Sequence, residues 1–459
     1  MSSTAYDLII IGSGSGNSLI GPEYDDKSVA VIESGVFGGT CLNVGCIPTK
    51  MFVYTAEVAA SARSAGRYGV EARVDAVRWP EVRDRIFGRI DPISAGGRDY
   101  RRDAANTTLY AGRAEFAAPG IVVVRGLPEG SSARLSAPSI VVATGSRPVL
   151  PPVVTESDVA VHTSDTVMRL ESLPSSMLII GGGYIGAEFA HVFAACGVQV
   201  TVVARGDALL RQQDEEISSR FTRAATDQWD VRLGTEVESL QAVDQGARAG
   251  LSDGTEVVAE VVLVATGRAP NSDLGLAAGG IDLHDDGRIK VDEFGRTTAP
   301  GVWALGDVSS PYQLKHVAND EARVVAHNLA HPDDLQAMHH DVVPSAVFTH
   351  PQIASVGMTQ AQAIEAGHDV TVKVQAYGDT AYGWAMEDTE SVLKLVGDRQ
   401  TGLLLGAHFL GPQASSLIQP LIQAMTFGLP AHQMARGQYW IHPALSEVIE
   451  NALLGLDFE

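Results

Sequence analysis

The segment YDLIIIGSGSGN, residues 6–17, reads as a short apolar strand that runs directly into a glycine-rich turn. A second apolar strand follows and ends in Glu33. This strand–turn–helix–strand order is typical of a dinucleotide-binding unit, in which a helix N-terminus binds a pyrophosphate. We expect Gly12 and Gly14 to form the turn and Glu33 to bind a ribose. Asn17 replaces the third glycine of the pattern, so the first helix should be short or loosely packed.

The segment MLIIGGGYIGAE, residues 177–188, repeats the strand and the glycine turn of the first segment. One such turn is weak evidence, because many matches are only tight turns. Two copies that each join a strand to a helix favour two nucleotide sites. In the second copy we expect the phosphate-binding turn at Gly181, Gly182, Gly183 and Gly186.

The second unit also indicates which nicotinamide cofactor it binds. Its second strand ends at Ala204, where a unit for NAD would place an acid for the adenine ribose, and Arg205 and Arg211 follow. A missing carboxylate and two guanidinium groups suit a 2′-phosphate, which arginine binds with paired hydrogen bonds. We therefore expect NADPH. The alternative is two solvated surface arginines.

Two of the three cysteines, Cys41 and Cys46, lie in the segment GGTCLNVGCIPTK, residues 38–50. On a regular helix they would lie too far around the cylinder to form a disulfide, but the glycines of this segment allow a distorted helix start. A helix N-terminus and a nearby cation such as Lys50 lower the pKa of a thiol and favour the reactive thiolate. A redox-active pair is therefore favoured over two buried free thiols. We expect Cys196 to be an unreactive core residue.

The segment WIHPALSE, residues 440–447, contains a histidine and a carboxylate at a spacing that suits acid–base chemistry. Thiol–disulfide exchange needs a group that protonates the departing sulfur, and histidine titrates near neutral pH. We expect Glu447 to hold the ring of His442 by a hydrogen bond. A purely structural histidine before proline is the alternative. No metal site is expected, because no histidines, cysteines or acids have convincing ligand spacing.

Charge and hydropathy exclude several classes of partner. The formal net charge of −22 argues against nucleic acid or an anionic membrane, because both need a basic surface. The N-terminal residues lack the charged and long apolar segments of a signal peptide. The longest apolar region, Met177–Ala204, contains Glu188 and His191 and is broken by glycines. We expect a cytoplasmic protein without a membrane span.

The cysteine segment, both glycine turns and HPALSE (442–447) together resemble the pyridine nucleotide–disulfide oxidoreductases, along the whole chain and with a highly specific cysteine motif. The resemblance implies that electrons pass from NADPH to FAD and then to a Cys41–Cys46 disulfide, with Cys46 facing the flavin and Cys41 attacking the substrate. It also implies a homodimer, in which His442 and Glu447 serve the cysteines of the partner subunit.

Further site residues follow from the same resemblance. Lys50 and Glu188 match the family's ion pair beside the reactive flavin nitrogen. The residues expected to bind FAD are Gly12, Gly14, Ser15, Gly16, Glu33, Thr40, Lys50, Ala114, Gly145, Asp307 and Lys315. Those expected to bind NADPH are Gly181, Gly182, Gly183, Ile185, Gly186, Glu188, Arg205, Arg211 and Gly267.

The chain is too long for one compact core, so several domains are expected. We predict an α/β protein with two Rossmann-like dinucleotide-binding domains, for FAD and NADPH, and an α+β C-terminal dimer-interface domain. The expected divisions are an FAD domain (1–150), an NADPH domain (151–272), a central segment that returns to the FAD domain (273–340) and the interface domain (341–459).

The expected substrate is a small-molecule disulfide. The arginines after Ala204 disfavour dihydrolipoamide dehydrogenase. The sequence LIGPE (19–23) lacks the arginine with which glutathione reductases hold substrate carboxylates. Five segments resemble the branch of the family that reduces mycothione, the disulfide of a cysteine–glucosamine–inositol thiol: FGRIDPI (87–93), HTSDTVMRL (162–170), AYGWAMEDT (381–389), QASSLIQPLIQAM (413–425) and ARGQYWIHPAL (435–445). We expect that activity, with glutathione reductase or a dihydrolipoamide dehydrogenase component as the alternatives.

Overall fold

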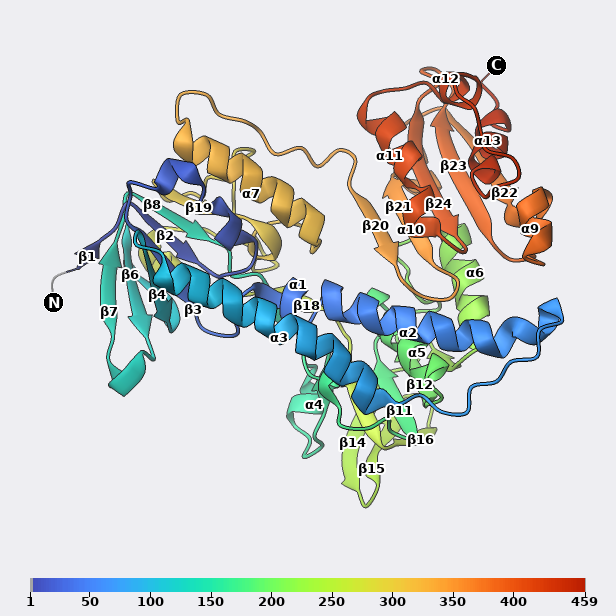
Figure 1. Cartoon of the computed structure of the whole chain (residues 1–459), viewed down its shortest axis with the longest axis horizontal. Helices are drawn as coiled ribbons and strands as arrows, with labels where there is room; N and C mark the ends of the chain where they lie inside the picture. Colours follow the sequence, from blue (N-terminus) through green and yellow to red (C-terminus); the bar gives the residue numbers. More distant parts are fainter. Residues whose placement is uncertain (1–2, 459) are drawn as a thin grey trace.

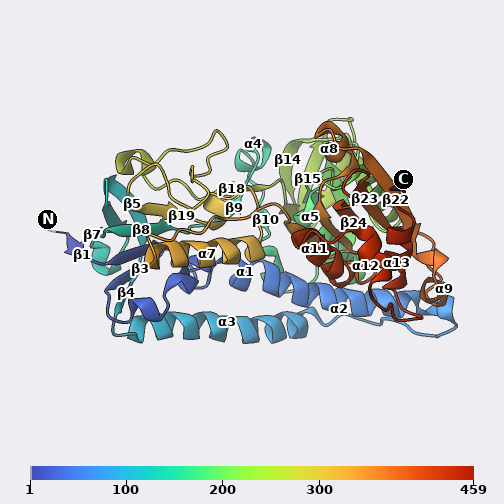
Figure 2. The same cartoon turned by 90° about the horizontal axis from the view of Figure 1, so that it is seen from above.

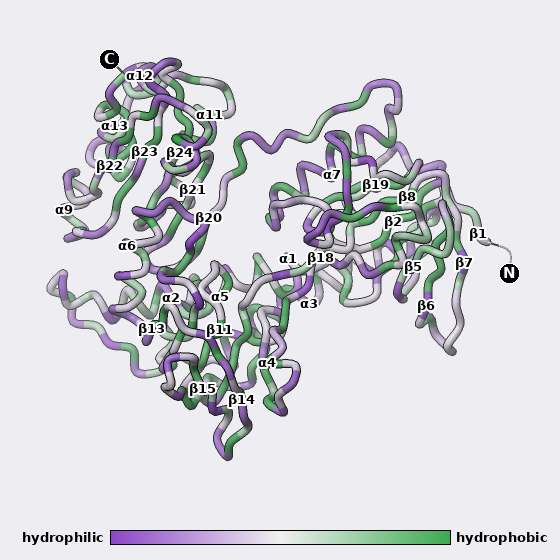
Figure 3. Tube along the Cα trace, turned by 180° about the vertical axis from the view of Figure 1, so that it is seen from behind, coloured by the Kyte–Doolittle hydropathy of each residue, from purple (hydrophilic) through white to green (hydrophobic). Residues whose placement is uncertain are grey.

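The computed structural model describes residues 3–458 and contains three units that are connected along one side by two long helices (Figures 1 and 2). Figure 3 shows the more hydrophobic parts of the trace along the strands of these units. Among the described residues, no helix is both long and apolar enough to cross a membrane.

The first glycine turn lies at the end of a parallel sheet with the strand order β19-β8-β2-β3-β4. The central strand β2 (Leu8–Ile11) is buried along its whole length, as expected for a parallel strand that is covered on both faces. The other four strands of this sheet are β3 (Val29–Glu33), β4 (Thr107–Ala111), β8 (Ser139–Val142) and β19 (Val302–Ala304), and β3 and β8 flank β2.

After this turn the chain forms only two short 3₁₀ helices, η1 (Ser15–Leu19) and η2 (Pro22–Tyr24). The short first helix expected from Asn17 is therefore confirmed. Arg101 holds Asn17 in place, because its Nε donates to Asn17 Oδ1 at 2.8 Å and its Nη2 donates to the Asn17 carbonyl at 2.9 Å. Helix α7 (Lys315–Ala330) packs against η1.

A second, smaller sheet completes the first unit. Its order is β1-β7-β6-β5, with antiparallel pairing except between β1 and β7. The strands are β1 (Thr4–Ala5), β5 (Arg113–Ala118), β6 (Ile121–Arg125) and β7 (Ala133–Ser136).

The second glycine turn belongs to another parallel sheet, with the order β10-β17-β11-β12-β13. Helix α5 (Tyr184–Ala195) begins at this turn, and an antiparallel sheet β14-β15-β16 extends the unit. The bounds are β10 (His162–Thr163), β11 (Ser176–Ile180), β12 (Gln199–Ala204), β13 (Asp230–Leu233), β14 (Val237–Val243), β15 (Gly246–Leu251), β16 (Glu256–Ala259), β17 (Val261–Val264), α4 (Pro152–Thr155) and α6 (Glu215–Thr226).

The chain passes from the first unit to the second through β9 (Ser146–Pro148) and returns through β18 (Arg268–Pro270). These two strands pair with each other in an antiparallel ribbon. We refer to β9 and β18 as the crossing strands.

The C-terminal unit is an antiparallel sheet in the order β20-β21-β24-β23-β22, packed with helices (Figure 1). A buried ion pair of 2.8 Å between Lys394 of this sheet and Asp214, the N-cap of α6, joins it to the second unit. The bounds are β20 (Pro344–Val347), β21 (Ile353–Gly357), β22 (Val370–Ala376), β23 (Val392–Asp398), β24 (Leu404–Leu410), α8 (Gln360–Glu365), α9 (Ala381–Ala385), α10 (Ala414–Leu417), α11 (Gln419–Thr426), α12 (Ala431–Arg436) and α13 (Glu447–Leu454).

Helices α2 (Cys46–Ser64) and α3 (Trp79–Asp103) connect the units. Three aromatic rings join them to α5: Phe52 stacks on Trp79 at a centroid distance of 4.7 Å, and Trp79 lies 5.4 Å from Phe193. All three side chains are buried, so this cluster fixes helix α2, which begins at Cys46, relative to the second glycine turn.

Candidate active site

Both glycine turns have the same backbone geometry. Gly12 and Gly181 have φ angles of 105° and 128°, and a methyl group at either position would collide with the carbonyl oxygen of Ala143 or Ala265. Only glycine fits there, and the neighbouring backbone N–H groups stay accessible to a phosphate. Gly183, the N-cap of α5, faces open space, so a pyrophosphate fits this turn.

The remaining turn residues lie where the pattern predicts. Gly14 and Gly16 lie at the start of η1, where Gly16 packs against Ile10 and Ala143. Ile185 and Gly186 lie in the first turn of α5, and Gly186 packs on the backbone of Gly181.

Glu33 is held by the first glycine turn. Its Oε2 accepts hydrogen bonds from the N–H and Oγ of Ser13 at 2.9 and 2.6 Å, and its Oε1 accepts one from the Gly35 N–H at 2.8 Å. Beside it lies a cavity of about 320 Å³, lined by Glu33, Gly35, Val36, Phe37, Asp91, Ser94, Ala95, Arg98, Leu109 and Ala111. A carboxylate beside a largely apolar cavity fits an adenosine. Sequence reasoning missed Ser13, because it occupies a variable position of the motif.

Several expected flavin contacts meet in the fold. Lys315 at the start of α7 donates from Nζ to Ser15 Oγ at 2.7 Å, although these residues lie far apart in the sequence. Asp307, just after β19, accepts a hydrogen bond of 2.6 Å from Ser146, the residue after Gly145. Two other expected contacts are Thr40, in the short helix α1 (Gly39–Asn43), and Ala114, which is buried in β5.

Cys41 and Cys46 lie on two separate helices. Cys41 is in the short helix α1 (Gly39–Asn43), and Cys46 is the first residue of α2. Gly45 breaks the path between them with φ and ψ of −131° and −121°. A side chain on Gly45 would collide with the Thr40 carbonyl, so glycine is required at this break. The expectation that the helix start departs from regular geometry is confirmed, and it allows the two sulfurs to meet.

A hydrogen bond between the two thiols gives them different pKa values. Both are free thiols, and the Cys41 thiol donates to the Cys46 sulfur. This hydrogen bond, assisted by the charge of Lys50, lowers the pKa of Cys46 to about 7, against the effect of burial. The same hydrogen bond and burial raise the pKa of Cys41. Near neutral pH the pair can therefore hold a thiolate on Cys46 and a proton on Cys41.

Lys50 and Glu188 form an ion pair one helical turn from Cys46. Lys50 Nζ lies 2.6 and 2.7 Å from the two carboxylate oxygens of Glu188. Glu188 is buried in α5 with only 5% of its side chain exposed, and it also accepts a hydrogen bond of 2.9 Å from the Phe348 N–H. The Lys50 ammonium lies 4.6 Å from the centre of the Phe348 ring. The Lys50–Glu188 ion pair thus connects helix α2, the second unit and the residue just after β20.

Tyr184 and Arg268 also belong to this region and were not predicted. Burial raises the pKa of the Tyr184 hydroxyl to about 12, and the charges of Arg268, Asp307, Glu188 and Cys46 have smaller effects on it. No motif pointed to either residue. A tyrosine inside a glycine turn and an arginine after a strand carry no signal of their own.

The arginines expected at the second nucleotide site lie beside its glycine turn. Arg205 directly follows β12, and the loop that carries Arg211 is fixed by a hydrogen bond of 2.9 Å from the Leu210 N–H to the Gly182 carbonyl. Both arginine side chains are exposed, and Arg211 lies 3.7 Å from Asp207. Gly267, after β17, faces open space near the crossing strands. The turn and the arginines together fit a dinucleotide with a free anionic group.

His442 and Glu447 form the expected hydrogen bond, with 2.7 Å between Nδ1 and Oε1. The hydrogen bond from His442 lowers the pKa of Glu447, so this carboxylate is ionised and can only accept. Nδ1 must then carry the proton, which leaves Nε2 free to exchange a proton with another group. The side chain of His442 is 70% exposed, so the ring has room for a partner.

Large apolar side chains are exposed on the unit that carries this histidine. Tyr439 and Ile441 immediately precede it and are strongly exposed, as are Trp384 and Phe427 of the same unit. Large exposed apolar side chains favour a surface that another protein covers. Within residues 3–458, no group of three or more histidines, cysteines or acids could hold a metal ion.

The family model described as pyridine nucleotide-disulphide oxidoreductase matches residues 6–322, and the model of its dimerisation domain matches residues 343–453. The chain belongs to the pyridine nucleotide–disulphide oxidoreductase family. This confirms the family and the α/β fold class expected from the sequence. Members of this family combine a flavin with a pyridine nucleotide to reduce or oxidise disulfides, and the dimerisation domain indicates a dimer.

Several known proteins are similar to this chain along its full length. Mycothione reductase of Mycobacterium tuberculosis is 56% identical, over 98% of this chain and 99% of its own length. Dihydrolipoyl dehydrogenase of Halobacterium salinarum is 36% identical, over 98% and 96%. The solved structure of a Cu(II) complex of the HOCl-induced flavoprotein disulfide reductase of Escherichia coli has a TM-score of 0.86 and 29% identity, with 99% of both chains covered.

Proposed function

We propose that this protein uses NADPH and FAD to reduce mycothione to two molecules of mycothiol. The observation that supports disulfide reduction is the contact of Cys41 and Cys46 beside the Lys50–Glu188 ion pair. The observation that supports mycothione is the full-length identity of 56% to a mycothione reductase. Reduction of another disulfide is the alternative.

FAD would bind the first unit, formed by residues 1–150 and 273–340, and NADPH would bind residues 151–272. The first glycine turn, Glu33 and Asp307 would hold FAD, together with Gly14, Ser15, Gly16, Thr40, Ala114, Gly145 and Lys315. The second turn and Arg205 and Arg211 would hold NADPH, together with Ile185, Glu188 and Gly267. Bound FAD supplies a two-electron carrier between the nicotinamide and the sulfur atoms. Residues 341–459 would form the dimer interface.

Cys41 would attack one sulfur of the substrate disulfide. A bond forms between Cys41 and that sulfur, the substrate S–S bond breaks, and the first thiol leaves with its bonding pair. The Cys46 thiolate then attacks Cys41, which closes the Cys41–Cys46 disulfide and releases the second thiol. The pair of electrons given to the substrate comes from the dithiol, which NADPH restores by way of the flavin.

His442 would manage the protons of this exchange. The pKa of Cys41 is raised, so the thiol needs a base before it can attack, and His442 Nε2 is the free acceptor. The resulting imidazolium, steadied by Glu447, would then protonate the first leaving thiolate. We propose that this histidine acts on the cysteines of the partner subunit, because its ring is exposed and the neighbouring Tyr439 and Ile441 are also exposed.

Arg205 and Arg211 would select NADPH over NADH. A charge-assisted hydrogen bond contributes roughly 1.5–3 kcal/mol, so replacing both with alanine should raise the KM for NADPH by about a hundredfold or more. The KM for NADH should change little. Arg223→Ala is the matched control, because Arg223 is an exposed arginine of the same unit that bonds to Ser219. An unchanged NADPH to NADH ratio would refute the assignment.

The substrate is tested by NADPH consumption with purified mycothione, glutathione disulfide and lipoamide under identical conditions. We expect kcat/KM for mycothione to exceed the other two by about a hundredfold or more, because hydroxyl-rich and anionic substrates need different polar partners. A higher kcat/KM for glutathione disulfide would overturn the substrate assignment, and a preference for NADH with lipoamide would favour the dehydrogenase alternative.

A further inference from the structure

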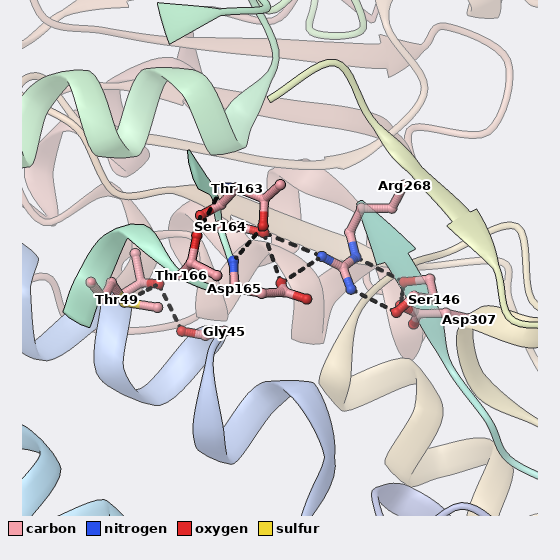
Figure 4. Close-up of polar contacts among 10 residues, drawn as sticks. Gly45, Thr49, Ser146, Thr163, Ser164, Asp165, Thr166, Arg268 and Asp307 are labelled. Atoms are coloured by element: carbon pink, nitrogen blue, oxygen red, sulfur yellow. Dashed lines mark hydrogen bonds and ion pairs between the residues drawn. The ribbon is translucent and has the colours of Figure 1, made fainter. Parts of the chain in front are cut away.

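Arg268 is a buried arginine between the two nucleotide units, and the chemistry above does not use it. Only 6% of its side chain is exposed. Burial of a guanidinium is unfavourable unless acceptors replace water on every side. Its Nε donates to Ser146 Oγ at 2.8 Å and its Nη2 donates to the Ser146 carbonyl at 2.7 Å (Figure 4).

The other nitrogen of Arg268 reaches the HTSDTVMRL segment. Nη1 donates to Ser164 Oγ and to Asp165 Oδ1, both at 3.3 Å, just after strand β10 of the second sheet (Figure 4). Farther along this segment, Met168 accepts a hydrogen bond of 3.6 Å from Thr49 of helix α2. Arg268 therefore contacts the opposite crossing strand and the second unit with one rigid group.

The direction of the hydrogen bonds at Ser146 is fixed by chemistry. Arginine carries donors only, so Ser146 Oγ accepts from Arg268 Nε. The single hydroxyl proton of Ser146 is then free to donate to Asp307 Oδ2, which lies at 2.6 Å. A hydrogen bond that polarises the serine hydroxyl also strengthens the next one in the chain.

We infer that Arg268 is a positioning residue that orients the Asp307 carboxylate through Ser146, and thereby links the angle of the crossing strands to flavin binding. We call this chain of contacts the Arg268–Ser146–Asp307 relay. With Oδ2 held by Ser146, the other carboxylate oxygen of Asp307 would remain available to the flavin. The inference rests on the proposed binding of FAD by Asp307.

The test compares full-length Ser146→Ala, Arg268→Lys, the double variant and Arg147→Ala. Arg147 is the matched control, because it lies on β9 and bonds to Pro270 and Asn271 of the return path but does not contact Asp307. The Kd for FAD is measured by fluorescence titration of flavin-free protein, and thermal unfolding of the same samples reports stability. Ser146→Ala keeps the test decisive if Arg268→Lys fails to fold, because it removes only a hydroxyl.

We expect Ser146→Ala and Arg268→Lys each to weaken FAD binding by about tenfold or more, since each removes a hydrogen bond that orients a charged group. The double variant should be no weaker than the poorer single variant, because both act through one relay. Arg147→Ala should bind FAD like the wild type. A Kd for Ser146→Ala within twofold of the wild type, or additive losses in the double variant, would overturn the inference.

Wild-type measurements separate this outcome from failure of the proposed function. If the wild type binds FAD but does not reduce mycothione with NADPH, the proposed substrate is wrong. The relay is then still tested by the Kd values of the variants for FAD. If it reduces mycothione and the variants bind FAD normally, the relay alone fails.

Discussion

The Cys41–Cys46 hydrogen bond gives two chemically identical side chains different protonation states near neutral pH. The donor thiol of Cys41 has a raised pKa, whereas the pKa of Cys46 is lowered to about 7. The division requires that the sulfurs approach each other from two helices, which the backbone at Gly45 allows. A thiolate is kept at the start of α2, where free backbone N–H groups and Lys50 favour negative charge.

Replacing Cys41 with alanine should raise the pKa of Cys46 above its value of about 7, because the largest stabilising contact of the thiolate is lost. Cys41→Ser keeps a hydroxyl donor and should raise it less. The measurement is the pH dependence of iodoacetamide alkylation of reduced protein, with the peptide that contains Cys46 followed by mass spectrometry. Both variants should lose disulfide reduction while NADPH still reduces the flavin. An unshifted alkylation midpoint in Cys41→Ala would contradict the shared proton.

Removal of the His442 ring should slow turnover by about two to four powers of ten, the usual contribution of acid–base assistance. Glu447→Gln should cost less, since the ring remains but its tautomer is no longer fixed by an ionised acceptor. Steady-state kcat is measured for both variants and for His432→Ala, an exposed histidine of the same unit. Equal activity of His442→Ala and His432→Ala would exclude an acid–base role.

At the scale of elements, the motifs that follow from local backbone geometry could be predicted from the sequence. Both glycine turns, the short η1 and the break before Cys46 follow from residues whose backbone or hydrogen-bonding constraints are local. Ser13, Ser146 and Arg268 could not be predicted, because their partners come from other strands. The roles of Ser146 and Arg268 depend on how the crossing strands pair, and no local pattern encodes that pairing.

Helix α5 contains a buried histidine whose titration should be visible in stability. His191 is 2% exposed, its Nε2 has no hydrogen-bond partner, and its ring lies 6.3 Å from that of His350. Burial, with a smaller effect of His350, lowers the pKa of His191 from 6.5 to about 4. Between these values the unfolded chain binds a proton that the folded chain does not, so stability is complete above pH 6.5 and falls as the pH drops toward 4.

Because of this histidine, the free energy of unfolding of the wild type should fall by about 2 kcal/mol between pH 7 and pH 5. His191→Leu should not show this loss. The free energy of unfolding of both proteins is measured with urea at pH 7 and at pH 5. The loss between the two pH values in the variant is then subtracted from the loss in the wild type, so that the contributions of the other titrating groups cancel. If the variant loses as much stability as the wild type over this range, the buried neutral histidine is not responsible.

At the scale of the whole molecule, the residues of the proposed site lie on separate units of the chain. Cys41 lies in α1 and Cys46 begins α2, whereas His442 lies before α13 in the C-terminal unit. Ile47, Tyr54 and Val58 occupy one exposed face of α2, and Tyr439 and Ile441 are exposed beside the histidine. A twofold dimer that covers these surfaces would bring each His442 to the other chain's cysteines, because such interfaces use the same patch twice.

A mixed dimer tests this geometry directly. A Cys41→Ser chain and a His442→Ala chain, each inactive as a homodimer, are produced together with two different affinity tags, and the doubly tagged dimer is isolated. If each site takes its histidine from the partner, one site of the mixed dimer contains an intact Cys41 and an intact His442. The dimer should then show about half of the wild-type activity toward mycothione. If each chain supplies its own histidine, both sites of the mixed dimer are defective, and activity should stay at the level of the homodimeric variants.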